Sequence, residues 1–213
     1  MPEQNRHIAI AVLIALAFLE LACGNPREKA RARLGEMNVT YSAASFVERA
    51  KDGDVFAVRY FLDAGMNPDV ADSEGKTPLV VAAEMGRLEV VQLLLDRGAR
   101  VDLRDAKYRA TPLIWASLGG HEHVAQLLLA KGADPKIKQQ QALDAVIAAA
   151  ARGRTKLVKL LLDHGANPKT TDKEGKTAVM WAAKAGDSAA VKLLTDAGAP
   201  WDRVPKAPET AKP

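Results

Sequence analysis

Three short segments of the chain share one order of apolar and polar positions. They read VVQLLLDRG (residues 90–98), VAQLLLAKG (residues 124–132) and LVKLLLDHG (residues 157–165). Each segment has the pattern of a short apolar helix. A glycine follows at the place where a helix ends in the left-handed conformation, which only glycine adopts cheaply. The pattern predicts three short helices, each ended by a glycine.

These closing glycines belong to a longer periodic series. Two sets of five glycines run through the chain, and in both sets the successive spacings are 33, 34, 33 and 33 residues. Two series that share one register, including the single one-residue insertion, predict five copies of one unit. The first set is Gly53, Gly86, Gly120, Gly153 and Gly186, and the second set is Gly65, Gly98, Gly132, Gly165 and Gly198.

A second short helix is expected ahead of each glycine of the first set. Residues 77–78 and 111–112 are both Thr-Pro, which supplies an N-cap hydroxyl followed by proline at the first helical position. Asp144 and Thr177 occupy the same place in the next two units. Each unit is therefore expected to hold a capped helix, a glycine turn, a second helix, a glycine stop and a polar loop.

Two segments carry a resemblance to a known family. TPLVVAAEMGRLEVVQLLLDRGA (residues 77–99) and TPLIWASLGGHEHVAQLLLAKGA (residues 111–133) resemble ankyrin repeats. The resemblance implies an all-α fold, an ankyrin-repeat solenoid of about five helix-turn-helix units joined by β-turn or hairpin loops. The expected repeat domain spans residues 41–204, with units at 44–76, 77–110, 111–143, 144–176 and 177–204.

The sequence departs from the family pattern in two units. Residues 144–153 lack the Thr-Pro start, so this unit is expected to be the least regular. The one-residue insertion falls in the loop that contains residues 107–109, which lacks the glycine found elsewhere as Gly75 and Gly175. This loop is therefore expected to differ in shape from its neighbours.

The start of the chain has the pattern of an export signal. Residues 8–19 are twelve consecutive apolar residues preceded by Arg6, a run shorter than the roughly 20 residues that span a bilayer. The segment ending at Cys23 resembles the lipobox of bacterial lipoproteins, in which the cysteine is lipidated. Glu20 stands where that family usually has leucine, and ordinary cleavage near residues 15–17 stays open. We expect residues 1–23 to be a lipoprotein-like signal peptide, 24–40 a charged tether and 205–213 a disordered tail.

Composition narrows the choice of partners. The 213 residues are 48% hydrophobic and 26% charged, and 30 Lys and Arg against 26 Asp and Glu give a net charge of +4. The sequence has no basic run interleaved with aromatic residues, so no nucleic-acid partner is expected. No cysteine follows Cys23, which excludes an internal disulfide and a thiolate zinc site.

No motif predicts catalysis. Gly-Lys-Thr occurs at residues 75–77 and 175–177, but the glycine that a phosphate-binding loop needs five positions earlier is missing in both copies. His121 and His123 are two residues apart, so they lie on different sides of a helix and do not form a metal site. We expect no enzyme activity, no cofactor and no metal, and structural roles for these residues.

The resemblance implies a protein partner bound on the concave face, which is formed by the loop tips and the exposed side of each first helix. Met85, Tyr108 and Leu118 are apolar at positions that are otherwise polar, which indicates exposed anchors. Basic residues surround them, so an acidic partner surface is expected, whereas Trp115 and Trp181 are expected to pack. The candidate positions are Ser73, Glu74, Lys76, Glu84, Met85, Arg104, Lys107, Tyr108, Arg109, Leu118, Gln140, Gln141, Arg152, Lys173, Glu174, Lys176 and Lys184.

Together these features predict a monomeric adaptor of the bacterial periplasm or envelope, attached to a membrane only through an N-terminal lipid. One alternative is an immunity protein that inhibits a secreted toxin or lipase. Another is a binder of anionic envelope polymers, whose affinity would fall steeply with salt. A host-directed effector is the fourth hypothesis, and lipidation counts against it because it would retain the protein in its own envelope.

Overall fold

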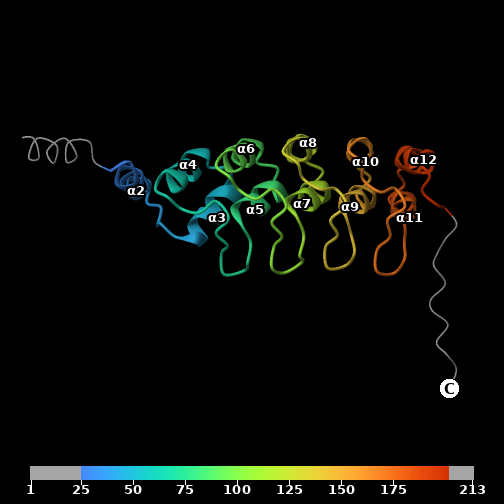
Figure 1. Cartoon of the computed structure of the whole chain (residues 1–213), viewed down its shortest axis with the longest axis horizontal. Coiled ribbons are helices and arrows are strands. Elements are labelled where there is room, and N and C mark those ends of the chain that lie inside the picture. Colours follow the sequence, from blue (N-terminus) through green and yellow to red (C-terminus); the bar gives the residue numbers. More distant parts are fainter. Residues whose placement is uncertain (1–24, 202–213) are drawn as a thin grey trace, which may run out of the picture.

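A computed structural model describes residues 25–201, which form a row of paired α-helices (Figure 1). The described residues contain eleven helices and no strand, and one isolated β-bridge joins Thr171 to Thr177. The helices are α2 (Pro26–Glu36), α3 (Ala43–Asp52), α4 (Val55–Asp63), α5 (Pro78–Glu84), α6 (Leu88–Asp96), α7 (Pro112–Gly119), α8 (Glu122–Ala130), α9 (Ala145–Ala151), α10 (Thr155–Asp163), α11 (Ala178–Lys184) and α12 (Ser188–Asp196).

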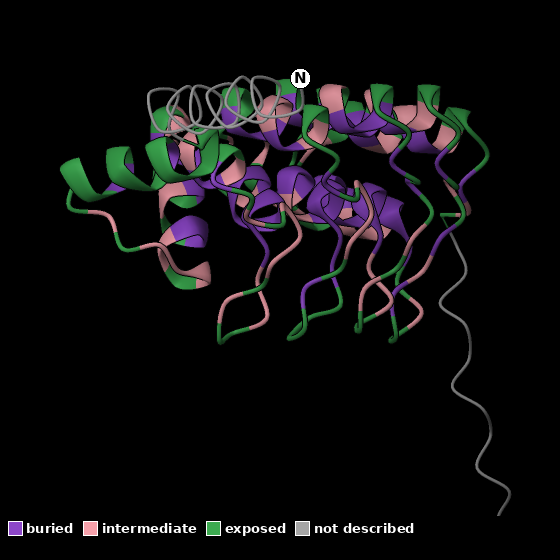
Figure 2. Ribbon diagram, turned by 60° about the vertical axis from the view of Figure 1, so that its left-hand side comes forward, coloured by how far each residue is buried: buried purple, intermediate pink, exposed green. Residues whose placement is uncertain are grey.

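The helices form two layers. An inner layer holds α3, α5, α7, α9 and α11, an outer layer holds α4, α6, α8, α10 and α12, and the hairpin loops project from the inner layer on the side away from the outer one (Figure 1). Each helix packs on its pair partner and on the same helix of the adjacent unit, and buried residues run along the whole row (Figure 2). The predicted all-α solenoid of five helix pairs is confirmed.

The inner helices begin at side-chain caps. The hydroxyls of Thr77, Thr111 and Thr177 each accept a hydrogen bond from the backbone N–H three residues later. The carboxylate of Asp144 does the same for Ile147, at 3.0 Å. Helix α9 has seven residues, as α5 and α11 do. The expectation that this unit is the least regular is therefore wrong, because aspartate caps a helix as well as threonine does.

The third hairpin differs from its neighbours, as the inserted residue predicts. Both oxygens of the Asp105 carboxylate accept backbone hydrogen bonds inside the longer loop, one from Tyr108 (2.6 Å) and one from Ala110 (3.1 Å). Arg109 takes a positive φ of 58°, at the place where the hairpins of the second and fifth units have Gly75 and Gly175. The carboxylate thus organises a turn that lacks the usual glycine.

Long side chains cover the glycine turn of the preceding unit. The ring of His121 lies against Gly86, and its Nε2 is 2.9 Å from the carbonyl oxygen of Glu84. Arg87 stands one unit earlier and donates from Nε to the carbonyl of Lys51 at 2.9 Å. Gly86 has a φ of 69°, which favours glycine, and an added Cβ would collide with the imidazole. His121 therefore has the structural role that the sequence indicated.

Residues 26–36 are helical, and here the structure differs from the expected extended tether. Helix α2 packs on α4 and buries Ala30 and Leu34, which are only 5% and 1% exposed. The guanidinium of Arg31 lies 4.5 Å from the ring centroid of Tyr41. Two apolar residues four positions apart are enough to dock an otherwise charged helix on the first repeat.

The expected lipidation at Cys23, the signal peptide and the tail at residues 205–213 lie outside the described residues. Within residues 25–201, no helix combines the length and the apolar character that crossing a bilayer requires.

Candidate functional site

Neighbouring hairpins are hydrogen-bonded to each other at their tips. Each of these bonds runs from a backbone N–H of one hairpin to a backbone carbonyl of the hairpin before it. The four hairpins therefore form a continuous wall beside the inner helices, which fixes the positions of the side chains that they carry. The bonds are Ala106 N–H to Gly75 O (3.1 Å), Gln140 N–H to Tyr108 O (2.9 Å) and Lys173 N–H to Gln141 O (3.3 Å).

At the α3 end, the wall and the inner helices enclose a hollow of about 390 Å³. The charges in it are largely balanced, since Lys76 Nζ lies 3.2 Å from Glu84 Oε2 and Glu48 and Lys51 line the same space. This end of the face is therefore not positive. The predicted residues that the structure brings together here are Ser73, Glu74, Lys76, Glu84 and Met85.

The middle of the face carries an aromatic pair. The rings of Tyr108 and Trp115 meet edge to face with centroids 5.6 Å apart, and Tyr108 is 41% exposed. Lys107 Nζ lies 5.1 Å from the Tyr108 centroid, and Lys76 Nζ lies 5.9 Å from that of Trp115. Leu118 is half-buried and packs against the core. Tyr108 is thus an accessible aromatic anchor with ammonium groups beside it, a combination common at interaction hot spots.

A buried carboxylate fixes the orientation of Trp115. Its indole N–H donates to Asp105 Oδ2 at 2.9 Å, and Asp105 is only 1% exposed. The same arrangement recurs two units later, where the indole N–H of Trp181 donates to Asp172 Oδ2 at 2.8 Å. Both indoles also pack against the core, as expected. With their N–H groups occupied, these side chains can offer a partner only their ring faces.

Sequence reasoning missed this aspartate–tryptophan lock, although a signal for it is present. In the third and fifth units an aspartate at the start of the hairpin is followed by tryptophan ten or nine residues later. The second and fourth units have Val81 and Ala148 in place of the tryptophan. The two residue types coincide only where the indole bond forms.

Basic side chains gather over the α9 and α11 half of the face. Lys176 and Lys184 both lie close to Trp181, with Nζ atoms 5.3 and 5.0 Å from its ring centroid. Within residues 25–201, none of the exposed cations of this half forms an ion pair. The predicted cations of this half are Arg152, Lys173, Lys176 and Lys184, with Glu174 as the predicted acidic neighbour. Lys107, beside Tyr108 in the middle of the face, is also exposed and forms no ion pair within the described residues.

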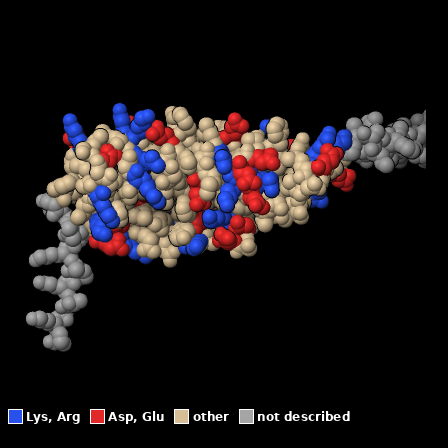
Figure 3. Space-filling model, turned by 180° about the vertical axis from the view of Figure 1, so that it is seen from behind, with Lys and Arg blue, Asp and Glu red and all other residues tan. Residues whose placement is uncertain are grey.

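Charged residues that connect successive units elsewhere are paired. On the face seen in Figure 3, basic and acidic side chains lie close together toward the N-terminal end. Exposed pairs of this kind contribute little to stability, but each neutralises a cation. The pairs are Asp63–Arg97 (2.7 Å), Asp69–Arg100 (2.7 Å), Asp96–Lys131 (2.8 Å) and Glu122–Lys156 (3.9 Å).

Arg104 and Arg109 line a separate hollow of about 620 Å³ together with Arg100. Loop residues alone form this hollow, and Asp102 lies at its base. Burial raises the pKa of Asp102, although its carboxylate accepts a hydrogen bond from the backbone N–H of Asp134. The basic residues expected around Tyr108 are therefore separated, since Arg104 and Arg109 line this hollow whereas Lys107 lies beside the Tyr108 ring.

His164, like His121, has a structural partner. Its Nδ1 lies 2.9 Å from the carbonyl oxygen of Leu160 at the end of α10, a position from which it can cap the helix. Among residues 25–201, no group of three or more His, Cys, Asp or Glu side chains is placed to hold a metal ion.

A row of helix pairs with one shared core, and with aromatic and charged side chains displayed beside a wall of hairpins, defines a helical-repeat protein with an extended binding surface. The family model described as ankyrin repeats (3 copies) matches residues 46–139 and 113–203. These matches cover well over half of the chain, which therefore belongs to the ankyrin-repeat family. No curated protein matches the chain. Ankyrin repeats are protein–protein interaction modules, so the partner class is a protein.

Proposed function

We propose that this protein is a non-enzymatic adaptor that binds one acidic protein partner through the α9 and α11 half of its concave face. One observation carries the proposal: the concave face displays five exposed cations that form no ion pair within residues 25–201, and two of them, Lys176 and Lys184, lie beside Trp181, whose indole N–H is bound by the buried Asp172.

Electrostatics and preorganisation both favour this face. The five cations lie on one side of a rigid row, so a complementary acidic surface would gain attraction without first breaking ion pairs within the protein. The tryptophans and Tyr108 supply apolar area, and the indole bonds limit the side-chain entropy that binding would cost. Tyr108, near the middle, is the expected hot spot, and Arg152, the exposed residue at the end of α9, is the charged contact expected in the next unit.

The proposed setting is the bacterial periplasm, with the chain acting as a monomer anchored through a lipid on Cys23. The apolar run at residues 8–19 and the lipobox-like segment support this location. Helix α2 begins at Pro26, so only two residues separate its start from Cys23. An anchored protein would therefore hold its first repeat close to the membrane surface. Replacing Cys23 with serine is expected to move the protein from the membrane fraction to the soluble fraction.

A narrower form of this proposal is an immunity protein that blocks a secreted toxin or lipase, since such a protein would use the same face. The hollow lined by Arg100, Arg104 and Arg109 favours one further candidate, an anionic envelope polymer. These two readings differ in salt dependence and in stoichiometry. Polymer binding would weaken steeply as salt rises and would not saturate at one to one.

The test is to incorporate a photo-crosslinking amino acid at position 108, to capture the partner in the envelope, and then to measure its affinity for variants. Tyr108→Ala and Arg152→Glu are each expected to weaken binding at least tenfold. Lys159→Glu is the matched control, because Lys159 is an exposed residue of the outer helix α10 and changes the net charge by the same amount. Equal affinities for all three variants would rule out the concave face.

A further inference from the structure

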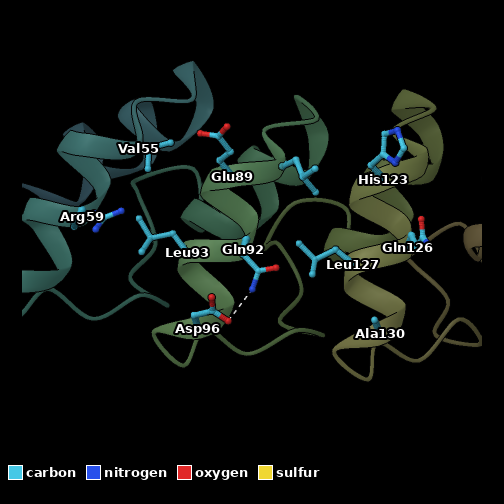
Figure 4. Close-up of a pocket in the computed structure, with 11 residues that line it drawn as sticks. Val55, Arg59, Glu89, Gln92, Leu93, Asp96, His123, Gln126, Leu127 and Ala130 are labelled. Atoms are coloured by element: carbon cyan, nitrogen blue, oxygen red, sulfur yellow. Dashed lines mark hydrogen bonds between the residues drawn. The ribbon is translucent and has the colours of Figure 1, made fainter.

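The outer layer contains a groove that the proposed function does not use. It has a volume of about 680 Å³ and runs over α4, α6 and α8, on the opposite layer from the hairpin wall (Figure 4). Figure 4 shows Arg59 on α4, Leu93 on α6 and Leu127 on α8 around this space. The residues that line it are Val55, Arg59, Leu88, Glu89, Gln92, Leu93, Asp96, His123, Gln126, Leu127 and Ala130.

A small residue, Ala130, lines the groove on the α8 side. The last position of the outer helix is aspartate in the other four units and alanine, Ala130, in the third. Two of these aspartates, Asp63 and Asp96, reach across to cations of the next unit. Ala130 cannot do so, and this series of ion pairs stops there. Ala130 and Leu127 both line the groove.

The floor of the groove is apolar and accessible. Leu88 is 41% exposed, and the neighbouring Leu93 and Leu127 are half-buried. Val55 extends the apolar surface onto α4, where Phe56 is 71% exposed beside it. A continuous apolar surface of this kind, bordered by polar residues, is typical of protein interaction sites.

The two open charges at the border of the groove have opposite signs. Arg59 on α4 and Glu89 on α6 both line it, and neither forms an ion pair within residues 25–201. Asp96, in contrast, is already occupied, since it accepts hydrogen bonds from Gln92 and Lys131 at 2.8 Å each. The groove therefore offers one cation on α4 and one anion on α6, and Leu127 lines it from α8.

We propose that this groove is a second docking surface, which takes one short amphipathic helix of a partner protein. Leucine-type side chains at helical spacing would pack on Leu88, Leu93 and Leu127. An acidic residue on one flank of the helix would meet Arg59, and a basic residue on the other flank would meet Glu89. Helix α6 has nine residues and is therefore roughly 14 Å long, so the bound segment would span about two to three helical turns.

The probe is a synthetic 14-residue peptide with leucines on one helical face, glutamates on one flank and lysines on the other. Its binding to the full-length chain is measured by fluorescence anisotropy, beside a scrambled peptide of the same composition. Leu93→Glu and Ala130→Asp are each expected to weaken binding at least tenfold. Leu160→Glu, the equivalent of Leu93 on α10 outside the groove, is expected to change it less than twofold, and circular dichroism checks that each variant is folded.

A second experiment tests charge complementarity by reversing the charge at position 59 and then the charge on the matching flank of the peptide. Arg59→Glu is expected to weaken binding of the first peptide about tenfold, and a peptide with lysine on both flanks is expected to recover it. Tyr108→Ala is expected to leave binding unchanged, since Tyr108 lies on the hairpin side of the other layer.

Three results would overturn this assignment. The first is equal binding of the scrambled peptide, and the second is full binding by Ala130→Asp. The third is concentration-dependent dimerisation in sedimentation velocity that Leu88→Asp abolishes, because it would make a second copy the occupant of the groove.

Discussion

Replacing Asp105 with alanine tests how the centre of the concave face is held in place. The Asp105 side chain is 1% exposed and accepts three hydrogen bonds, from Tyr108 N–H (2.6 Å), Ala110 N–H (3.1 Å) and the Trp115 indole N–H (2.9 Å). The alanine variant loses all three acceptors at once. Both the turn that presents Tyr108 and the orientation of Trp115 depend on this carboxylate.

The expected cost follows from where the three donors lie. A buried donor left without a partner costs about 1–3 kcal/mol, whereas an exposed donor recovers most of its bond from water. Ala110 is buried, Trp115 is half-buried and Tyr108 is exposed. We therefore expect Asp105→Ala to lower the free energy of unfolding by about 3 kcal/mol.

Asp72 is the matched control in the second hairpin. It is half-buried and accepts two backbone bonds, from Glu74 and Lys76, both at 2.9 Å, and no indole bond. Because both donors can reach water, Asp72→Ala is expected to cost only about 1 kcal/mol. Urea unfolding followed by circular dichroism measures both variants. If the two losses are equal, the indole lock does not stabilise the third unit and the reasoning fails.

Three further predictions concern other parts of the chain. Burial raises the pKa of the Asp144 carboxyl in the folded state, so ionisation of this carboxyl at higher pH lowers the free energy of unfolding. Asp144→Thr keeps a capping hydroxyl and removes the ionisable group. The variant should have a higher free energy of unfolding than the wild type at pH 7, and this difference, measured by urea unfolding, should disappear as the pH is lowered toward 4. Leu34→Asp should detach α2, at a cost of about 2–4 kcal/mol, and open it to trypsin, whereas an extended tether would be cleaved equally in the native protein. Gly86→Ala should cost about 2 kcal/mol more in thermal unfolding than Gly98→Ala, since both positions have positive φ but only Gly86 lies under the His121 ring. Equal losses would dismiss that contact.

Local patterns made the repeat architecture predictable. The Thr-Pro starts and the apolar helix segments each act within about ten residues, the glycine period repeats them along the chain, and the structure follows them unit by unit. Helix α2 escaped the same reasoning because its sequence is mostly charged and only Ala30 and Leu34 are buried. Asn25 followed by Pro26 is a capping signal in this segment, so the start of the helix was predictable from sequence whereas its packing partner α4 was not.

The candidate site, too, could be predicted from the sequence only in part. The positions on the concave face follow from the repeat frame, and the exposure of Met85 and Tyr108 agrees with their selection as anchors. Arg104 and Arg109 line another hollow because of the shape of the enlarged loop in the third unit. The inserted residue predicts that this loop differs from its neighbours, but it does not predict the shape that the loop takes. The outer groove lies between helices of different units, so it could not be predicted from the pattern of one unit. Ala130, which replaces the usual aspartate at the end of an outer helix, is the one unusual residue among those that line it.

Because the units share one frame, the residue at one position can differ from unit to unit while the helix pairs stay the same. Tryptophan stands beside the hairpin aspartate in the third and fifth units, and Ala148 takes its place in the fourth, so the two indoles flank a unit that offers a small buried side chain. The exposed cations that form no ion pair lie over the same stretch, whereas Lys76 at the α3 end is paired with Glu84. A partner that matched only the charge would bind along this stretch in several registers. The two fixed indoles select one register, and this is the physical reason to expect a single specific protein partner on this face.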